Sequence, residues 1–232
     1  MTKYKENLLP NTYYHIYNRT NNKEAMFRSA ENRRYFLKKY ADYLYPYLKT
    51  YAYCLMDNHF HLLVQVRSEK EIVQAIQAKS LDERKKIEIT YLKISEDVTG
   101  FQNLSRLTSH SFTHNLVAKL FQDFFNSYTK AFNKMYERSG NLFNRPFKRV
   151  AVKDDSHFTQ LIYYIHANPC HHKVRHSFKA YKWSSYTSFL SDKPTLLDRQ
   201  AVISWFGQLK SFVAFHDRPQ DFGEIDYILV EE

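Results

Sequence analysis

The chain contains little cysteine and little glycine. Of its 232 residues only two are cysteine and four are glycine. Two cysteines cannot form the disulfide framework that stabilises small secreted domains, so we expect a reducing, cytoplasmic environment. The four glycines are scattered and leave no glycine-rich loop that could wrap a phosphate chain. Hydrolysis of nucleoside triphosphates therefore has no support in this sequence.

Long apolar runs are also missing, and acidic side chains are outnumbered. No stretch approaches the roughly 20 apolar residues of a helical membrane span, and residues 1–7 lack the apolar core of a secretory signal. We therefore expect no membrane segment. The 34 Lys and Arg residues exceed the 24 Asp and Glu residues, which gives a net charge of +10. This excess favours a polyanionic partner, either nucleic acid or an anionic membrane surface.

Two histidines stand two residues apart in an otherwise apolar segment, residues 56–66, which reads MDNHFHLLVQV. Side chains alternate between the two faces of a β-strand, so His59 and His61 share one face while Phe60, Leu62 and Val64 share the other. Neutral imidazoles are good ligands for divalent cations, and a strand holds two of them close enough to converge on one ion. The pattern alone is also typical of two half-exposed histidines.

Periodicity predicts the other elements and an α+β fold. Strands are expected over residues 13–19, 49–56, 59–66 and 144–153, and helices over 33–47, 70–78, 115–136 and 156–168. This order predicts a ferredoxin-like antiparallel sheet with helices mainly on one face. The histidine face would be the open one, with the helix over 156–168 folded near it and ended by Pro169.

The predicted domain spans residues 1–186 and contains an insertion. Residues 79–112 are polar and weakly periodic, so we interpret them as an insertion without an assigned structure. Residues 187–232 are interpreted as a small C-terminal appendage with one helix over 198–215.

The helix over residues 156–168 carries the polar groups that could complete a site. Its apolar stripe is expected to face the core. Tyr164 and Asn168 are separated by one helical turn and lie together at the border of that stripe. Tyr163 is rotated away by about 100° and is interpreted as a packing or surface ring. Position alone favours an ordinary helix tyrosine at Tyr164.

Basic side chains gather on both sides of this helix. Arg145, Lys148 and Arg149 precede it, and Lys173 and Arg175 follow it. These five residues could form a solvated face, but the net charge favours contact with phosphates. A zinc site at residues 170–172, which read CHH, is disfavoured because no second cysteine pair accompanies it.

Four ordered blocks of sequence carry a family resemblance. They are residues 56–64 (MDNHFHLLV), 139–148 (SGNLFNRPFK), 163–169 (YYIHANP) and 181–186 (YKWSSY). Together they resemble the REP-associated tyrosine transposases, which belong to the single-strand HUH transposases. The likeness runs from about residue 13 to residue 186. The length of residues 79–112 departs from the compact form of that family.

The resemblance implies a one-tyrosine transposase that cleaves and rejoins single-stranded DNA beside a stem-loop. It implies that His59, His61 and Asn168 hold one Mg²⁺ or Mn²⁺. It also implies that Tyr164 attacks the scissile phosphate to leave a 5′-phosphotyrosine. A homodimer is compatible with this role, although the sequence does not give the oligomeric state. Two other classes of function stay open: a module that binds nucleic-acid hairpins without cutting, and a metal-dependent nuclease that uses water.

Overall fold

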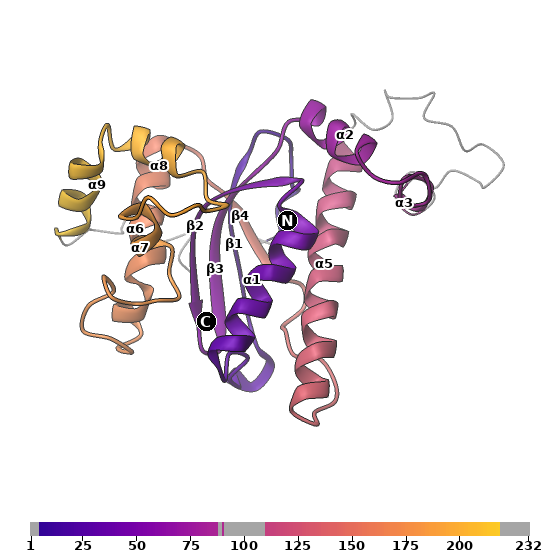
Figure 1. The fold of residues 1–232 in the computed structure, drawn as a ribbon, viewed down its shortest axis with the longest axis horizontal. Coiled ribbons are helices and arrows are strands. Elements are labelled where there is room, and N and C mark those ends of the chain that lie inside the picture. Colours follow the sequence, from indigo (N-terminus) through magenta and orange to yellow (C-terminus); the bar gives the residue numbers. More distant parts are fainter. Residues whose placement is uncertain (1–4, 88–89, 91–109, 219–232) are drawn as a thin grey trace.

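The computed structural model describes residues 5–87, 90 and 110–218. A four-stranded antiparallel sheet lies between two layers of helices (Figure 1). The strands are β1 (Tyr13–Arg19), β2 (Leu48–Met56), β3 (His59–Val66) and β4 (Lys148–Ala151), in the spatial order β2-β3-β1-β4. The predicted α+β class with an antiparallel sheet is confirmed. The histidine strand β3 is central and pairs with both β1 and β2.

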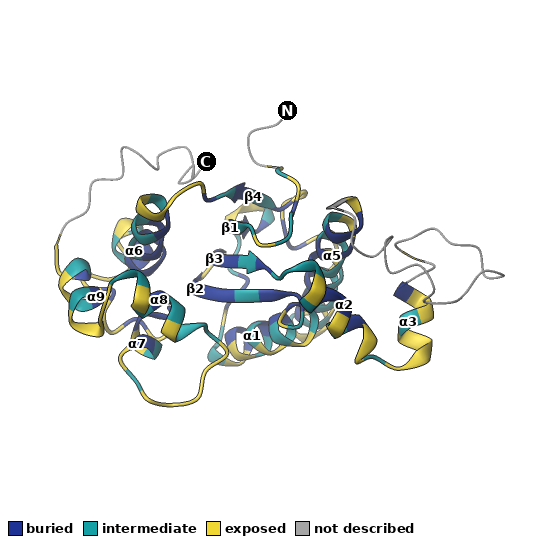
Figure 2. Ribbon diagram, turned by 90° about the horizontal axis from the view of Figure 1, so that it is seen from above, coloured by how far each residue is buried: buried dark blue, intermediate teal, exposed yellow. Residues whose placement is uncertain are grey.

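One face of the sheet is covered by α1 (Ala30–Leu44), α2 (Glu69–Gln77) and α5 (His110–Met135) (Figure 1). Phe60, Leu62, Val64 and Val66 of β3 are buried in the core on this face, as the alternation predicts. Helix α1 begins after Ser29, whose side chain accepts a hydrogen bond from the backbone N–H of Asn32. The helices turn their buried sides toward the sheet and their exposed sides outward (Figure 2).

The second helical layer covers the histidine face. It consists of α6 (Asp155–His171), α7 (Tyr186–Phe189), α8 (Arg199–Trp205) and α9 (Leu209–His216). Phe158, Leu161, Ile162 and Ile165 of α6 are buried in one cluster with Leu63 of β3. The expectation that this face is open is therefore wrong. Burial of this apolar stripe against the sheet is the driving force that closes it.

The segment with sequence YKWSSY protects the free edge of the sheet. Strand β2 lies at one edge, where unpaired backbone groups would be exposed. The N–H of Leu55 donates to the carbonyl oxygen of Trp183, and the N–H of Ser185 donates to that of Tyr53, each at 2.9 Å. The hydroxyl of Tyr181 donates to the carbonyl oxygen of Leu55 at 2.9 Å. This block of the family resemblance therefore has a structural role here.

Three boundaries differ from the prediction. Strand β4 covers only Lys148–Ala151, because Pro146 has no N–H for the ladder. Helix α6 continues through Pro169 to His171; the proline removes one hydrogen bond, but the N–H of His172 still donates to the carbonyl oxygen of Asn168. The expected single helix over 198–215 is two helices, α8 and α9, separated at Gly207, whose φ of 78° is left-handed.

The predicted insertion is described in part. Residues of α3 (Leu81–Ile87) form a short helix beyond α2, and α5 begins at residue 110. Residues 88–89 and 91–109, which make up most of the predicted insertion, lie outside the described residues. Over the described ranges, no helix combines the length and the apolar character needed to cross a bilayer.

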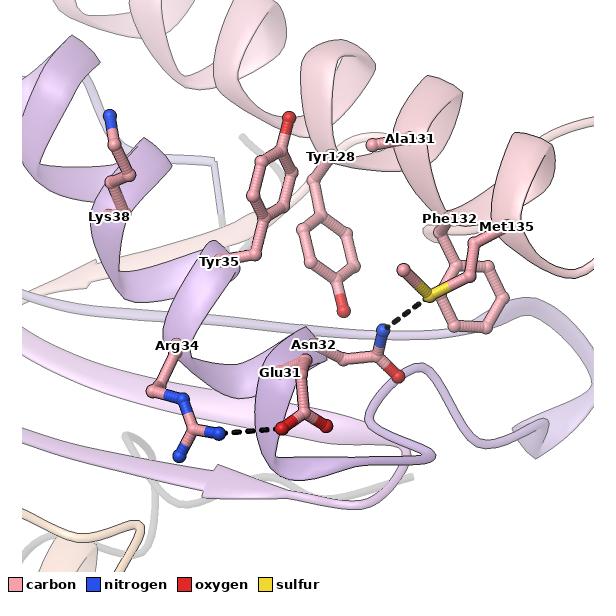
Figure 3. A pocket seen from close by; sticks show the side chains of 9 residues that line it. All are labelled: Glu31, Asn32, Arg34, Tyr35, Lys38, Tyr128, Ala131, Phe132 and Met135. Atoms are coloured by element: carbon pink, nitrogen blue, oxygen red, sulfur yellow. Dashed lines mark hydrogen bonds and ion pairs between the residues drawn. The ribbon is translucent and has the colours of Figure 1, made fainter.

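A hollow of about 560 Å³ lies between α1 and α5, on the side away from α6. Figure 3 shows the rings of Tyr35 and Tyr128 side by side in it, with the amide of Asn32 facing the sulfur of Met135. The Nδ2 of Asn32 lies 3.4 Å from that sulfur, and Arg34 pairs with Glu31 at its rim. This hollow lies on the other side of the sheet from the histidines.

Candidate active site

His59 and His61 lie on β3 beneath α6. Their side chains share one face of the strand, as predicted, and their ring centroids are 5.2 Å apart with nearly perpendicular planes. Both residues are buried, at 8% and 2% exposure. The helix that carries Tyr164 and Asn168 packs directly on β2 and β3, so all four side chains meet in one place.

The Nδ1 atom of each imidazole is held by a neighbour. The Nδ1–H of His59 donates to Oδ1 of Asn58 at 2.7 Å, and Nδ1 of His61 lies 2.9 Å from Nε2 of His15. Such outer contacts fix the tautomer and the orientation of a ligating imidazole. In His59 this contact turns Nε2 toward α6, where it lies within hydrogen-bond distance of Asn168.

Asn168 supplies a third donor atom from α6. Its side chain is completely buried, and its Oδ1 lies 3.1 Å from Nε2 of His59. Adjacent ligands of an octahedral Mg²⁺ are about 3 Å apart, since each lies about 2.1 Å from the ion. Within the described ranges no three His, Cys, Asp or Glu side chains are grouped to hold a metal. A cation at this place would therefore rely on two imidazoles and one amide, and both are donor types that a divalent ion accepts.

Tyr164 lies against His61, and Tyr163 does not. The Tyr164 ring meets the His61 ring edge-on at 5.6 Å. Tyr163 instead packs edge-on against Phe178 at 5.9 Å, on the outer side of α6, which confirms its interpretation as a packing ring. Tyr128 is on the other side of the sheet, where its hydroxyl donates to the carbonyl oxygen of Met26.

Two residues of β1 belong to the site and were missed by the sequence analysis. His15 is completely buried and stacks on His61 at 5.1 Å, and Tyr17 stacks on His15 at 4.6 Å. Tyr17 also lies opposite His61 in the antiparallel register. The sequence of residues 13–17 (YYHIY) indicates that His15 and Tyr17 share one face of a strand. Only the pairing of β1 with β3 shows that this face is the one that carries His61.

The end of α6 closes over the site. The ring of His171 lies 5.4 Å from Tyr164, and that of His172 lies 4.6 Å from His59. The exposed residues Lys173 and Arg175 follow directly. These two predicted phosphate contacts thus follow the turn that meets the imidazoles, and their role stays a prediction.

Of the other three predicted phosphate contacts, two lie on opposite faces of β4 and the third precedes the strand. Lys148 lies on the histidine face, with its Nζ 5.7 Å from the Tyr17 ring. Arg149 lies on the α5 face, where its guanidinium donates to the carbonyl oxygen of Glu6; burial lowers its pKa. Arg145 is exposed, and its Nη2 donates to Oδ1 of Asn126 on α5 at 3.1 Å. A DNA strand that ran along the histidine face would therefore meet Lys148, but neither Arg149 nor Arg145.

A buried chain of hydrogen bonds ties α6 to α9. Nδ1 of His216 donates to the carbonyl oxygen of Phe212 at 2.8 Å, so its Nε2 accepts from Nδ1 of His166 at 2.9 Å. Nε2 of His166 then accepts from the hydroxyl of Ser185 at 2.8 Å. In this arrangement both imidazoles are neutral. Burial lowers the pKa of His216 to about 4 and that of His166 in the same direction.

This histidine pair should make the fold sensitive to mild acid. An unfolded histidine takes up a proton near pH 6.5, whereas folded His216 does so only near pH 4. The stabilisation is therefore complete above about pH 6.5 and is lost as the pH falls toward 4, by up to about 3 kcal/mol for His216. Urea denaturation at pH 7, 6 and 5 measures this loss. His216→Gln should flatten the pH dependence, and substitution of the exposed His176 by Gln should leave it unchanged.

The comparisons with known proteins agree with the motifs. Residues 9–105 match the model of the family described as "Transposase IS200 like". The matched segment contains β1, β2 and β3, and hence His15, His59 and His61. The predicted resemblance to this group of transposases is thereby confirmed. The match ends before α6, so it does not include Tyr164 or Asn168.

A solved structure also resembles the chain. Its description is "Structure of the REP associates tyrosine transposase bound to a REP hairpin". The similarity has a TM-score of 0.47 at 12% identity, and it covers 85% of this chain and 94% of the other. None of the curated proteins matches this chain.

Proposed function

We propose that the protein is a metal-dependent strand transferase that cleaves and rejoins single-stranded DNA beside a stem-loop. Tyr164 is the nucleophile in this proposal, and His59, His61 and Asn168 hold one Mg²⁺ or Mn²⁺. The observation that carries the proposal is the convergence of these four side chains from β3 and α6. Two elements distant in sequence place a phenol, two imidazoles and an amide in one buried cluster.

The chemistry needs no further reactant. The phenol oxygen of Tyr164 forms a bond to phosphorus, the bond from phosphorus to the 3′-oxygen breaks, and the proton lost by the phenol is balanced by the proton gained at the 3′-hydroxyl. The phosphotyrosine keeps the energy of the diester for religation, which attack by water would discard. When bound, the cation would polarise the phosphoryl oxygen and offset charge on the leaving oxygen. Lys148, Lys173 and Arg175 would attract the DNA backbone.

A trapped covalent adduct tests the proposal. The protein is incubated with Mn²⁺ and a hairpin oligonucleotide that carries single-stranded flanks, and the products are separated under denaturing conditions. We expect a covalent complex with the 5′ end of the cut strand, and peptide mapping should find the nucleotide on Tyr164. Cleavage without an adduct would instead identify a nuclease that uses water.

One observation favours a second function, a hairpin-binding module that does not cut. Tyr164 is only 4% exposed, so little of its side chain is displayed to solvent. Such a module would bind the hairpin tightly and yield neither nicked DNA nor adduct. The same incubation therefore separates the two functions.

His15 should act as a positioning residue for His61. Its Nε2 lies 2.9 Å from Nδ1 of His61, and this contact holds the ring with Nε2 toward the site. We expect His15→Phe to weaken Mn²⁺ binding by about 10- to 100-fold, the range found for outer partners of metal ligands. His15→Gln, which can place an acceptor near the same point, should recover part of this loss. Calorimetric titration with Mn²⁺ gives the affinities, and equal affinity of the Phe variant and wild type would contradict the role.

A further inference from the structure

A second hollow, of about 470 Å³, lies between α5 and the segment that leads into β4. Its floor is formed by Phe125, Phe143 and Phe147, with ring centroids 4.9 Å apart for the first pair and 5.6 Å apart for Phe125 and Phe147. Each of these residues retains between 5% and 8% exposure. A hollow of this size and apolar character can hold a small planar group.

The rim of this hollow is polar. Gln122 and Asn126 of α5 and the exposed Asn144 and Arg145 line it. Side-chain amides and guanidinium groups hydrogen-bond to the edges of nucleobases, and aromatic rings and guanidinium planes stack on their faces. An aromatic floor with such a rim is the chemistry that recognises an unpaired base.

Strand β4 separates this hollow from the histidine site. It is an edge strand, and its alternating side chains place Lys148 over Tyr17 on one face and Arg149 over Phe147 on the other. Lys5 and Glu6 lie along this edge at Arg149. Single-stranded DNA would therefore round the edge where the strand begins, past Lys148 and the exposed Arg145, and pass from the histidine site to the hollow. Neighbouring strands are only about 5 Å apart, so the path around one strand is short.

We infer that this hollow binds one unpaired base of the DNA strand that flanks the stem-loop. The inference rests on the proposed function for its substrate, and it adds a recognition site on the opposite face of the sheet. The occupant is a nucleotide because the rim offers base-edge partners and positive charge together. The rim amides would make the site selective for particular bases at one position.

An abasic scan tests the inference. A hairpin oligonucleotide with single-stranded flanks has each flanking nucleotide replaced in turn by an abasic one, and affinities are measured at fixed salt. We expect one position where the missing base lowers the affinity of wild type by about tenfold, the scale of one stacked base. Ala118→Trp, which fills the hollow from α5, should remove the effect of that position and leave binding of a hairpin without flanks unchanged.

The control is the same substitution on the same helix outside the hollow. Ala131 lines the hollow between α1 and α5 (Figure 3), so Ala131→Trp should bind like wild type at every position. If Ala118→Trp unfolds the protein, the pair Gln122→Ala and Asn126→Ala, which removes rim amides, replaces it. The inference would be overturned if no abasic position lowered the affinity of wild type, or if the two Trp variants changed the affinities equally. If an adduct forms on Tyr164 but no abasic position lowers the affinity, only the inference is overturned. If one abasic position lowers the affinity but no adduct forms, only the proposed function is overturned.

Discussion

Tyr164→Phe is expected to abolish the covalent adduct with cut DNA. The change removes one oxygen from a ring that lies 5.6 Å from His61, so the rate should fall by a factor on the order of 10⁴ or more. Removal of one hydroxyl should cost no more than about 1 kcal/mol of stability. Denaturing electrophoresis of labelled DNA measures the adduct, and hairpin affinity should stay nearly normal.

Two matched variants make this result specific. Tyr163→Phe changes the neighbouring ring, which packs on the outer side of α6, and should keep full adduct formation. Tyr17→Phe removes the other phenol beside His61, at a centroid distance of 5.8 Å. A modified peptide that contains Tyr17 instead of Tyr164 would show that the nucleophile comes from β1, and our assignment would then be refuted.

Loss of either imidazole should abolish cleavage that depends on a divalent cation. We expect His59→Ala and His61→Ala to lower the rate by at least about a hundredfold in Mg²⁺ or Mn²⁺, because each removes one of three donors. Calorimetry should show the same loss of Mn²⁺ binding. His176→Gln, an exposed substitution, should behave as wild type in both measurements.

These variants should also reveal the burial of the site. A surface histidine could be replaced at almost no cost, but His61 is 2% exposed and lies against Tyr17, His15 and Tyr164. Truncation of a buried ring leaves a cavity, so we expect His61→Ala to lose about 2–4 kcal/mol in urea denaturation. A normal rate of nicking in either variant would rule out the metal assignment.

Local patterns predicted the parts of the site that lie on one element. The alternation of β3 placed His59 and His61 on one face, and the spacing of one helical turn placed Tyr164 and Asn168 together. These relations depend on backbone geometry alone, which a short stretch of sequence determines.

Contacts between distant elements were beyond such patterns. His15 reaches His61 only because β1 pairs with β3 in a particular register, which no short window of sequence contains. The histidine face looked open because the apolar stripe of α6 could have packed elsewhere. The two faces of β4 likewise divide Lys148 from Arg149, although the sequence joins them in one basic run.

The continuation of α6 beyond Pro169 has a kinetic consequence. The last turn carries His171 over the Tyr164 ring. Because Pro169 has no N–H, this turn is joined to the rest of the helix by one hydrogen bond fewer. Because Tyr164 is only 4% exposed, we expect a phosphate to reach the phenol only after this turn moves aside. Binding and cleavage should therefore be separate events in time. As the DNA concentration rises, the rate of adduct formation should level off at a value that the opening of this turn sets, on the microsecond-to-millisecond scale of such motions or slower.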